Sequence, residues 1–204
     1  LVGETGPMRE IRALVERIGA STSTVLIEGE AGTGRKLLAR LLHDRSGVPG
    51  PLIAVDCRTT DRAALTRALG RDAAATTLFL GEIDAMPLDL QAELLRSMAG
   101  ESGETDGDPR SAGRLFAATQ TNLAELVARH RFREDLWHRL RVMRIGLPPL
   151  RERRADIPLL AAYFNDRLSA EMGRPPVELQ PADLEALVTH DWAGNVTELR
   201  QVIE

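Results

Sequence analysis

Residues 25–36 read Val-Leu-Ile-Glu-Gly-Glu-Ala-Gly-Thr-Gly-Arg-Lys, and this stretch decides the fold. The apolar run Val25–Ile27 predicts a buried strand, and leucines at helical spacing after the stretch predict a helix. Gly29, Gly32 and Gly34 lie between the two. Such a turn can wrap a phosphate, because its backbone N–H groups turn inward and a helix N-terminus adds a partial positive charge. The stretch therefore predicts a phosphate-binding loop between a strand and a helix.

The loop matches the P-loop motif in its glycine spacing and departs from it in the residues that follow. The motif asks for Lys and then Ser or Thr after Gly34, whereas Arg35 and Lys36 stand there. Arginine presents a planar fork that is not equivalent to the point charge of lysine. Lys36 cannot replace it directly, because one step along a helix rotates a side chain by about 100°. We therefore expect nucleotide binding to survive and hydrolysis to be weak or absent.

The composition argues against several classes of protein. The 204 residues carry a formal net charge of −4, which argues against direct DNA binding by this segment. The single cysteine, Cys57, rules out an internal disulfide and fits a reducing compartment. No apolar run approaches the roughly 20 residues of a membrane span. We expect a cytoplasmic protein without a membrane partner.

Short strands and helices alternate along the chain. Four more strands are predicted at 51–55, 76–80, 114–119 and 142–147, and the first of these is apolar enough to be buried. From residue 156 onward the pattern is helical, at 156–172, 181–190 and 194–204. This alternation predicts an α/β fold in which a five-stranded parallel sheet lies between helices, followed by a small helical domain.

An acidic turn, Gly81-Glu82-Ile83-Asp84, follows the strand at 76–80. P-loop enzymes use acidic groups at such a strand end to hold Mg²⁺ and to polarise the attacking water. An acidic turn after a strand does not by itself indicate a metal site or a catalytic site. After a phosphate-binding loop, it is predicted to form the second half of the same site.

Six motifs, spread over nearly the whole chain, occur in an ordered set. They are Gly29–Gly34, Thr77–Ile83, Phe132–Leu136, Arg139-Leu140, Leu147–Arg153 and Trp192–Leu199. Together they resemble the central AAA+ domain of bacterial enhancer-binding proteins, the activators of sigma-54 RNA polymerase. The resemblance implies an AAA+ P-loop fold, with residues 1–150 as the nucleotide-binding subdomain and 151–204 as a truncated helical lid.

The resemblance also implies a ligand and a set of site residues. ATP or ADP is the expected ligand, and Glu82 and Gln120 take catalytic positions. Arg133 and Arg139 correspond to paired arginine fingers that reach the nucleotide of a neighbouring subunit, although a solvated basic face is the alternative interpretation. The residues expected to bind the nucleotide are Val2, Gly3, Gly29, Glu30, Ala31, Gly32, Thr33, Gly34, Arg35 and Lys36.

Further positions depart from the family pattern. Gly81 stands where the family has the Walker B aspartate that organises Mg²⁺. Gln120 replaces the usual sensor I asparagine, and Thr197 replaces the sensor II arginine. We therefore assign no metal ligand and leave Mg²⁺ binding open.

A deletion separates this chain further from the family. Only residues 71–75 join Gly70 to Thr76, where the family carries a long insertion with the Gly-Ala-Phe-Thr-Gly-Ala loop that contacts sigma-54. No such loop fits in this span. We expect the chain not to remodel sigma-54 polymerase.

The leading hypothesis is a regulatory AAA+ module, excised from a bacterial transcription regulator, that binds ATP or ADP without efficient hydrolysis and mediates self-association as a homo-oligomer or ring. Its expected partners are further copies, the sensory and DNA-binding domains of the full-length chain, and RNA polymerase. One alternative is an active Mg²⁺-dependent ATPase with a rearranged site, in which Asp84 or Asp56 joins Glu82. Another is a scaffold, or a pocket for a different ligand such as a cyclic dinucleotide.

Overall fold

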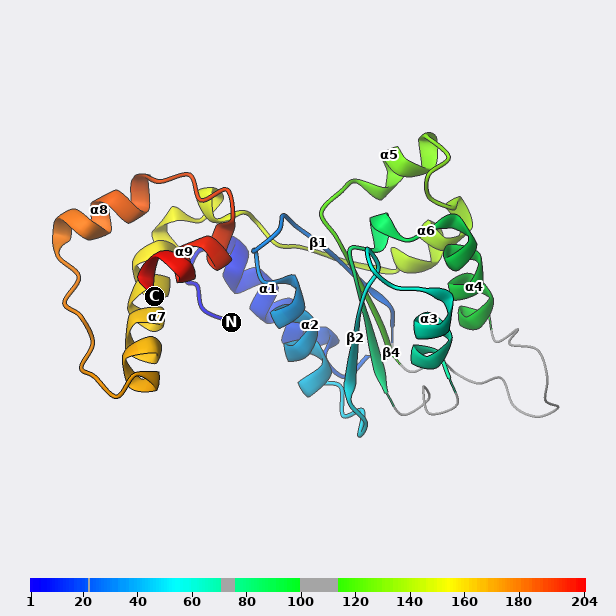
Figure 1. Cartoon of the computed structure of the whole chain (residues 1–204), viewed down its shortest axis with the longest axis horizontal. Coiled ribbons are helices and arrows are strands. Elements are labelled where there is room, and N and C mark those ends of the chain that lie inside the picture. The colour runs from blue at the N-terminus through cyan, green and yellow to red at the C-terminus, as the bar shows by residue number, and fades with distance from the viewer. Residues whose placement is uncertain (22, 71–75, 100–113) are drawn as a thin grey trace. The chain divides into compact units, whose positions relative to one another are not determined.

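The computed structural model describes residues 1–21, 23–70, 76–99 and 114–204. These residues form two compact units, and Figure 1 traces them along the chain. The first unit comprises Leu1–Leu14, Gly29–Arg35 and Leu147–Glu204, and the second comprises Val15–Glu28 and Lys36–Gly146. The span 71–75, on which the predicted deletion rests, lies outside the described residues. The predicted boundary between residues 150 and 151 stays a prediction.

The second unit is built on a five-stranded sheet, and the predicted α/β fold is confirmed. The strand order is β2-β3-β4-β1-β5, and every pairing is parallel. The strands are β1 (Val25–Glu28), β2 (Leu52–Asp56), β3 (Thr77–Gly81), β4 (Arg114–Thr119) and β5 (Met143–Gly146). Because the strands are parallel, their carboxyl ends share one edge of the sheet, where sites of α/β proteins form.

The prediction of a buried strand at 51–55 is wrong about burial. β2 pairs with β3 alone and lies at the edge of the sheet. Most of its residues are partly buried, and Ala54 is exposed. An apolar run does not reveal its place in the strand order, so an edge strand and a central strand read alike in sequence.

Helices complete the sheet unit. They are α2 (Arg35–Asp44), α3 (Arg62–Ala68), α4 (Leu88–Met98), α5 (Leu123–Ala128) and α6 (Glu134–Leu140), while α1 (Gly6–Ile18) contributes to both units. The apolar faces of α3, α4, α5 and α6 share a core with the sheet. Leu26, Leu80, Leu94, Leu115 and Leu136 are among the buried residues of this core. Cys57 belongs to it as well, and burial raises the pKa of its thiol to about 12.

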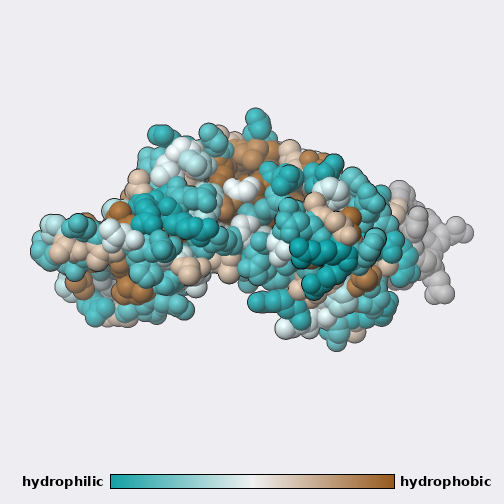
Figure 2. Space-filling view, turned by 90° about the horizontal axis from the view of Figure 1, so that it is seen from above, coloured by the Kyte–Doolittle hydropathy of each residue, from teal (hydrophilic) through white to brown (hydrophobic). Residues whose placement is uncertain are grey.

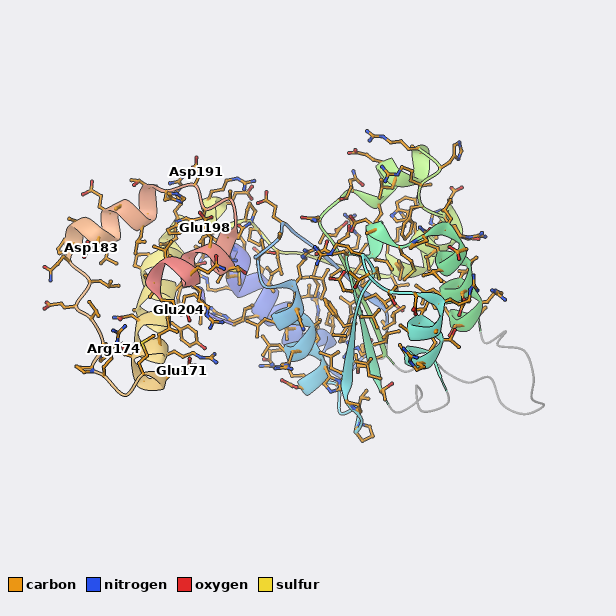
Figure 3. The ribbon with its side chains drawn as sticks, viewed as in Figure 1. Glu171, Arg174, Asp183, Asp191, Glu198 and Glu204 are labelled. Atoms are coloured by element: carbon orange, nitrogen blue, oxygen red, sulfur yellow. The ribbon has the colours of Figure 1, made fainter. Side chains whose placement is uncertain are left out.

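The first unit carries the helices that follow the sheet. Two short 3₁₀ turns, η3 (Leu150–Glu152) and η4 (Arg154–Asp156), lead into α7 (Ile157–Glu171), α8 (Pro181–Thr189) and α9 (Asn195–Ile203). Leu150, Ile157, Leu160, Trp192 and Leu199 form its apolar core. Figure 3 shows charged side chains such as Asp183 and Asp191 projecting from this unit.

Hydrophilic side chains cover most of the face shown in Figure 2, with hydrophobic ones in small patches. Among the described residues, no helix combines the length and the apolar character that a membrane span requires.

A buried arginine fastens two helix ends to the start of β4. The Arg114 guanidinium donates to the carbonyls of Ile18 at 2.8 Å, Gly19 at 2.6 Å and Leu42 at 3.3 Å. It also lies 4.8 Å from the centre of the Phe116 ring. These carbonyls belong to the ends of α1 and α2, where the helix dipole is negative, so the cation is stabilised there.

Replacing Arg114 by methionine is expected to lower the free energy of unfolding by about 3 kcal/mol, because buried carbonyls would lose their charged donor. Chemical denaturation followed by circular dichroism measures this change. Arg129 is exposed and lies 3.8 Å from Glu125, so Arg129→Met is a suitable control and should change stability by less than about 0.5 kcal/mol. Equal effects of the two substitutions would contradict this role of Arg114.

Candidate functional site

The loop between β1 and α2 has the conformation that its glycines predict. Gly32 and Gly34 have φ angles of +77° and +106°, a region that side chains disfavour. The Thr33 hydroxyl donates to the Glu30 carbonyl at 2.7 Å and closes the turn. The loop therefore has the strand, turn and helix order that a phosphate cradle needs.

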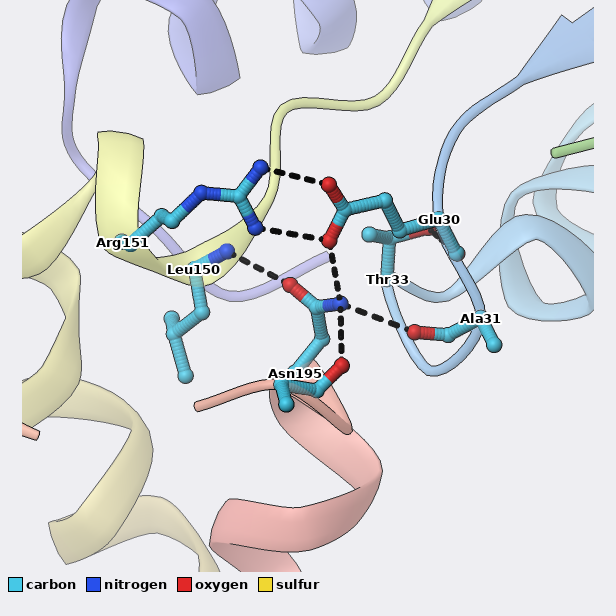
Figure 4. A network of polar contacts seen from close by, with 7 residues as sticks. Glu30, Ala31, Thr33, Leu150, Arg151 and Asn195 are labelled. Carbon is cyan, nitrogen blue, oxygen red and sulfur yellow. Dashed lines mark hydrogen bonds and ion pairs between the residues drawn. The ribbon is translucent and has the colours of Figure 1, made fainter. Parts of the chain in front are cut away.

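A network of polar contacts holds the outer side of this loop, and Figure 4 shows it at close range. The Glu30 carboxylate accepts two bonds from Arg151, at 2.8 and 2.5 Å, and a third from the Asn195 amide at 3.2 Å. The same amide donates to the Ala31 carbonyl at 2.9 Å and accepts from the Leu150 N–H at 2.7 Å. These contacts, from Arg151 first, lower the pKa of Glu30 to about 2. Glu30 is thus an ionised anchor at ordinary pH.

The start of α9 packs against the loop at a second point. The Val196 N–H donates to the Gly32 carbonyl at 3.0 Å. A Cβ atom on Gly32 would overlap the carbonyl oxygen of Gly194 and would lie 3.2 Å from the Thr197 hydroxyl. Only glycine fits at this point, and the residue at the predicted sensor II position places a hydroxyl rather than a cation beside the space that a Cβ atom would fill.

The two cations that follow the loop differ in their surroundings. Arg35, the first residue of α2, is 8% exposed, whereas Lys36 is exposed. Neighbouring positions on a helix face directions about 100° apart, which accounts for the difference.

The start of the chain belongs to the same unit as the loop. The buried Asp156 carboxylate accepts from the N–H groups of Glu4 at 2.6 Å and Thr5 at 3.0 Å, and from the Thr5 hydroxyl at 2.7 Å. A Cβ atom on Gly3 would lie 2.9 Å from Asp156 Oδ2, so glycine allows this close approach. Val2 packs on the apolar core of the unit.

A second buried arginine supports the loop from within. Arg153 is 3% exposed and donates to the Thr33 carbonyl at 3.2 Å and to the Met8 sulfur at 3.0 Å. Sequence reasoning used Arg151, Arg153 and Asn195 only as parts of motifs and missed their contacts with the loop. Each of these polar residues stands beside apolar residues in its motif. That pattern could have indicated a buried polar contact.

The sheet unit holds the other predicted site residues. Gly81 is the last residue of β3 and pairs with Asp56 of β2, and Glu82 follows with a φ angle of +53°. The Asp84 carboxylate accepts from the hydroxyls of Thr119 at 2.8 Å and Thr121 at 3.0 Å. Its two oxygens are thereby used to fix the turn that carries Gln120.

Asp56, the other carboxylate considered as a metal ligand, is also engaged. The Arg58 guanidinium donates to both of its oxygens, at distances down to 2.6 Å, and holds the pKa of Asp56 at about 2. Across the described part of the chain, no group of three or more His, Cys, Asp and Glu side chains could hold a metal ion.

Gln120 and the two predicted finger residues are exposed. Arg133 precedes α6 and forms a two-point ion pair with Asp135, at 2.7 and 3.1 Å, which raises the pKa of the guanidinium. Arg139 lies one and a half turns later and donates to the Leu95 carbonyl at 3.5 Å. Both arginines are accessible to a second molecule.

Comparison with known proteins covers the entire chain. The model of the sigma-54 interaction domain matches residues 2–150, and that of the AAA+ ATPase lid domain matches residues 151–204. The nitrogen fixation protein VnfA of Azotobacter vinelandii is 38% identical over 226 aligned positions, which take in 100% of this chain and 43% of VnfA. The formate hydrogenlyase transcriptional activator FhlA of Escherichia coli is 39% identical, over 100% of this chain and 33% of FhlA. The chain therefore spans less than half the length of these curated relatives.

Solved structures show the same fold. NtrX from Brucella abortus, crystallised in complex with ADP, has a TM-score of 0.89 and 31% identity and covers 100% of this chain and 50% of NtrX. The NtrX structure in complex with ATP has a TM-score of 0.88 and 30% identity, over 100% of this chain and 51% of NtrX.

Gly32 and Gly34 offer a matched test of how the loop is supported. Alanine at either position is strained by a positive φ angle, but only at position 32 does it also collide with Gly194. Gly32→Ala should therefore lower the free energy of unfolding by about 1–3 kcal/mol more than Gly34→Ala. Thermal or urea unfolding of the two variants measures the difference. Equal losses would show that backbone strain alone explains the glycine at position 32.

Proposed function

Because the chain belongs to the sigma-54 interaction domain family and is an AAA+ domain of the transcriptional activators in that family, we propose that it is a regulatory module that binds ATP or ADP. It hydrolyses ATP weakly or not at all and uses the bound nucleotide to set its self-association. It does not remodel sigma-54 polymerase. Its partners are further copies of itself, the sensory and DNA-binding domains of its full-length chain, and RNA polymerase.

The observation that carries this proposal is the state of the carboxylates at the ends of β2 and β3. Gly81 supplies no side chain, while Asp56 is held by Arg58 and Asp84 by Thr119 and Thr121. A Mg²⁺ ion demands carboxylate and water oxygens in near-octahedral geometry. Asp56 and Asp84 keep free lone pairs, but in this proposal their present donors hold them in orientations that do not complete such a ligand set. Nucleotide binding that depends little on Mg²⁺ follows from this arrangement.

The phosphate loop supports retained binding. Its glycine conformations and its contacts with Arg151, Asn195 and Val196 are those of a built loop. The ADP and ATP complexes of NtrX support the choice of ligand. We assign nucleotide contacts to the residues Val2, Gly3, Gly29, Glu30, Ala31, Gly32, Thr33, Gly34, Arg35 and Lys36.

Catalytic positions belong to Glu82 and Gln120 in this proposal, and Arg133 and Arg139 act in trans. The exposure of both arginines on the α6 segment supports a role between copies. Their effect on rate is small in this chain, since an arginine finger accelerates a reaction that the metal and the P-loop lysine must first support.

The proposed loss of the sigma-54 contact is supported by the length of this chain. The alignment with VnfA extends over 226 positions for a chain of 204 residues, so VnfA has residues that this chain lacks. This difference supports a deletion within the aligned region, and the proposal assigns it to residues 71–75.

Calorimetry should detect ATP and ADP binding, with dissociation constants that change less than about threefold when Mg²⁺ is added or chelated. A phosphate-release assay on the same sample should show no steady turnover. Mg²⁺-dependent binding with steady phosphate release would instead establish an active ATPase. Absence of any nucleotide binding would leave a scaffold, or a pocket for another phosphorylated ligand.

Restoring the missing carboxylate tests the metal argument directly. A Cβ atom on Gly81 would lie 3.4 Å from Phe79 and 3.6 Å from the Val55 carbonyl, so a side chain can start there in ordinary van der Waals contact. Gly81→Asp should make ATP affinity depend on Mg²⁺ by about tenfold, a difference of roughly 1.4 kcal/mol. Gly81→Asn has the same shape without the charge and should leave affinity independent of Mg²⁺. If both variants respond alike, side-chain volume and not the carboxylate determines the response.

A further inference from the structure

We propose that the helical part of the first unit reads nucleotide occupancy through Glu30, with Arg151 and Asn195 as positioning residues for the phosphate loop. This inference rests on the proposed nucleotide binding and adds a route by which binding reaches α9. The route uses the outer side of the loop and needs no cation at Thr197.

The geometry of one peptide bond carries the first step. A trans peptide is planar, so its N–H and C=O groups point in opposite directions. Asn195 Nδ2 holds the Ala31 carbonyl at 2.9 Å, and the N–H of Gly32 on the same peptide therefore points away from Asn195. In this inference that N–H is one of the backbone donors to a bound phosphate.

Asn195 is well suited to fix this peptide. It is fully buried, has a φ angle of +54°, and is itself held by the Leu150 N–H at 2.7 Å. Its amide also donates to Glu30, whose carboxylate is held at two points by Arg151. The orientation of the loop peptide and the position of α9 are therefore joined by a continuous set of short bonds.

Coupling of this kind acts in both directions. If a phosphate tightens the inner side of the loop, the bonds on its outer side tighten with it, and α9 is held more firmly. If the outer bonds are removed, the loop must be ordered by the phosphate itself, so nucleotide affinity falls.

The chain provides a matched control two residues before Glu30. Glu28 and Arg144 form an ion pair of the same kind, at 2.7–3.0 Å, between β1 and β5. In both pairs the side chains are more than a quarter exposed, so substitutions should leave the fold intact. Of the two pairs, only the one at Glu30 is bonded to Asn195, which holds the Ala31 carbonyl.

The experiment compares Glu30→Gln and Arg151→Met with Glu28→Gln and Arg144→Met. All are made in a Trp137→Phe background, so that Trp192 is the single tryptophan. Trp192 is buried in the core of the first unit, and its carbonyl accepts from the Asn195 N–H at 2.8 Å, which makes its fluorescence a reporter for the start of α9. Calorimetry gives the affinity for ADP, and Trp192 emission is recorded at saturating ADP.

We expect Glu30→Gln and Arg151→Met each to weaken ADP binding about tenfold and to abolish the ADP-induced change in Trp192 emission. The double variant should bind no more weakly than the weaker single variant, because both changes break one connection. Glu28→Gln and Arg144→Met should bind within about twofold of the parent and keep the emission change.

Two outcomes are distinguishable as failures. If the parent binds ADP and the Glu30 and Arg151 variants behave like the Glu28 and Arg144 variants, the inference is wrong and the proposed function stands. If the parent binds neither ADP nor ATP, the proposed function is wrong and the inference falls with it.

Discussion

Parallel pairing of β1 with two neighbours is the constraint on which the rest of the structure depends. Val25 is paired with Phe116 of β4 on one side and with Met143 of β5 on the other, so β1 cannot shift its register without breaking two ladders. Within the sheet unit, β1 is therefore fixed in register, and Val25, Leu26 and Ile27 are buried there.

The sequence is sufficient for the architecture and insufficient for the state of the site. Strong periodicity and glycine spacing predict β1, the loop and α2, and the strand at 114–119 has the bounds predicted for it. The edge position of β2 could not be predicted, because strand order depends on tertiary pairing. Nor could the engagement of Asp84 by Thr119 and Thr121, since hydrogen bonds between residues 35 and 37 positions apart leave no local pattern. The contact between Glu30 and Asn195 could not be predicted for the same reason, because the two residues are 165 positions apart.

Two of the predicted departures from the family pattern, Gly81 and Thr197, stand where a charged side chain is expected. Arg151, Arg153 and Asn195, in contrast, make direct contacts that hold the loop. Binding depends mainly on the shape of the loop and hydrolysis on the placement of charge, so the two properties can be lost separately.

The two ends of β4 serve different purposes: its first residue holds helices in place, and its last residue fixes a turn at the candidate site. Arg114 begins the strand and fastens α1 and α2, and Thr119 ends it and fixes the turn beside Asp84. At about 3.3 Å per residue the two lie roughly 16 Å apart, too far for a substitution at one to disturb the other. Substitutions at the carboxyl edge of the sheet can therefore change the surroundings of Asp84 without loosening the attachment of α1 and α2.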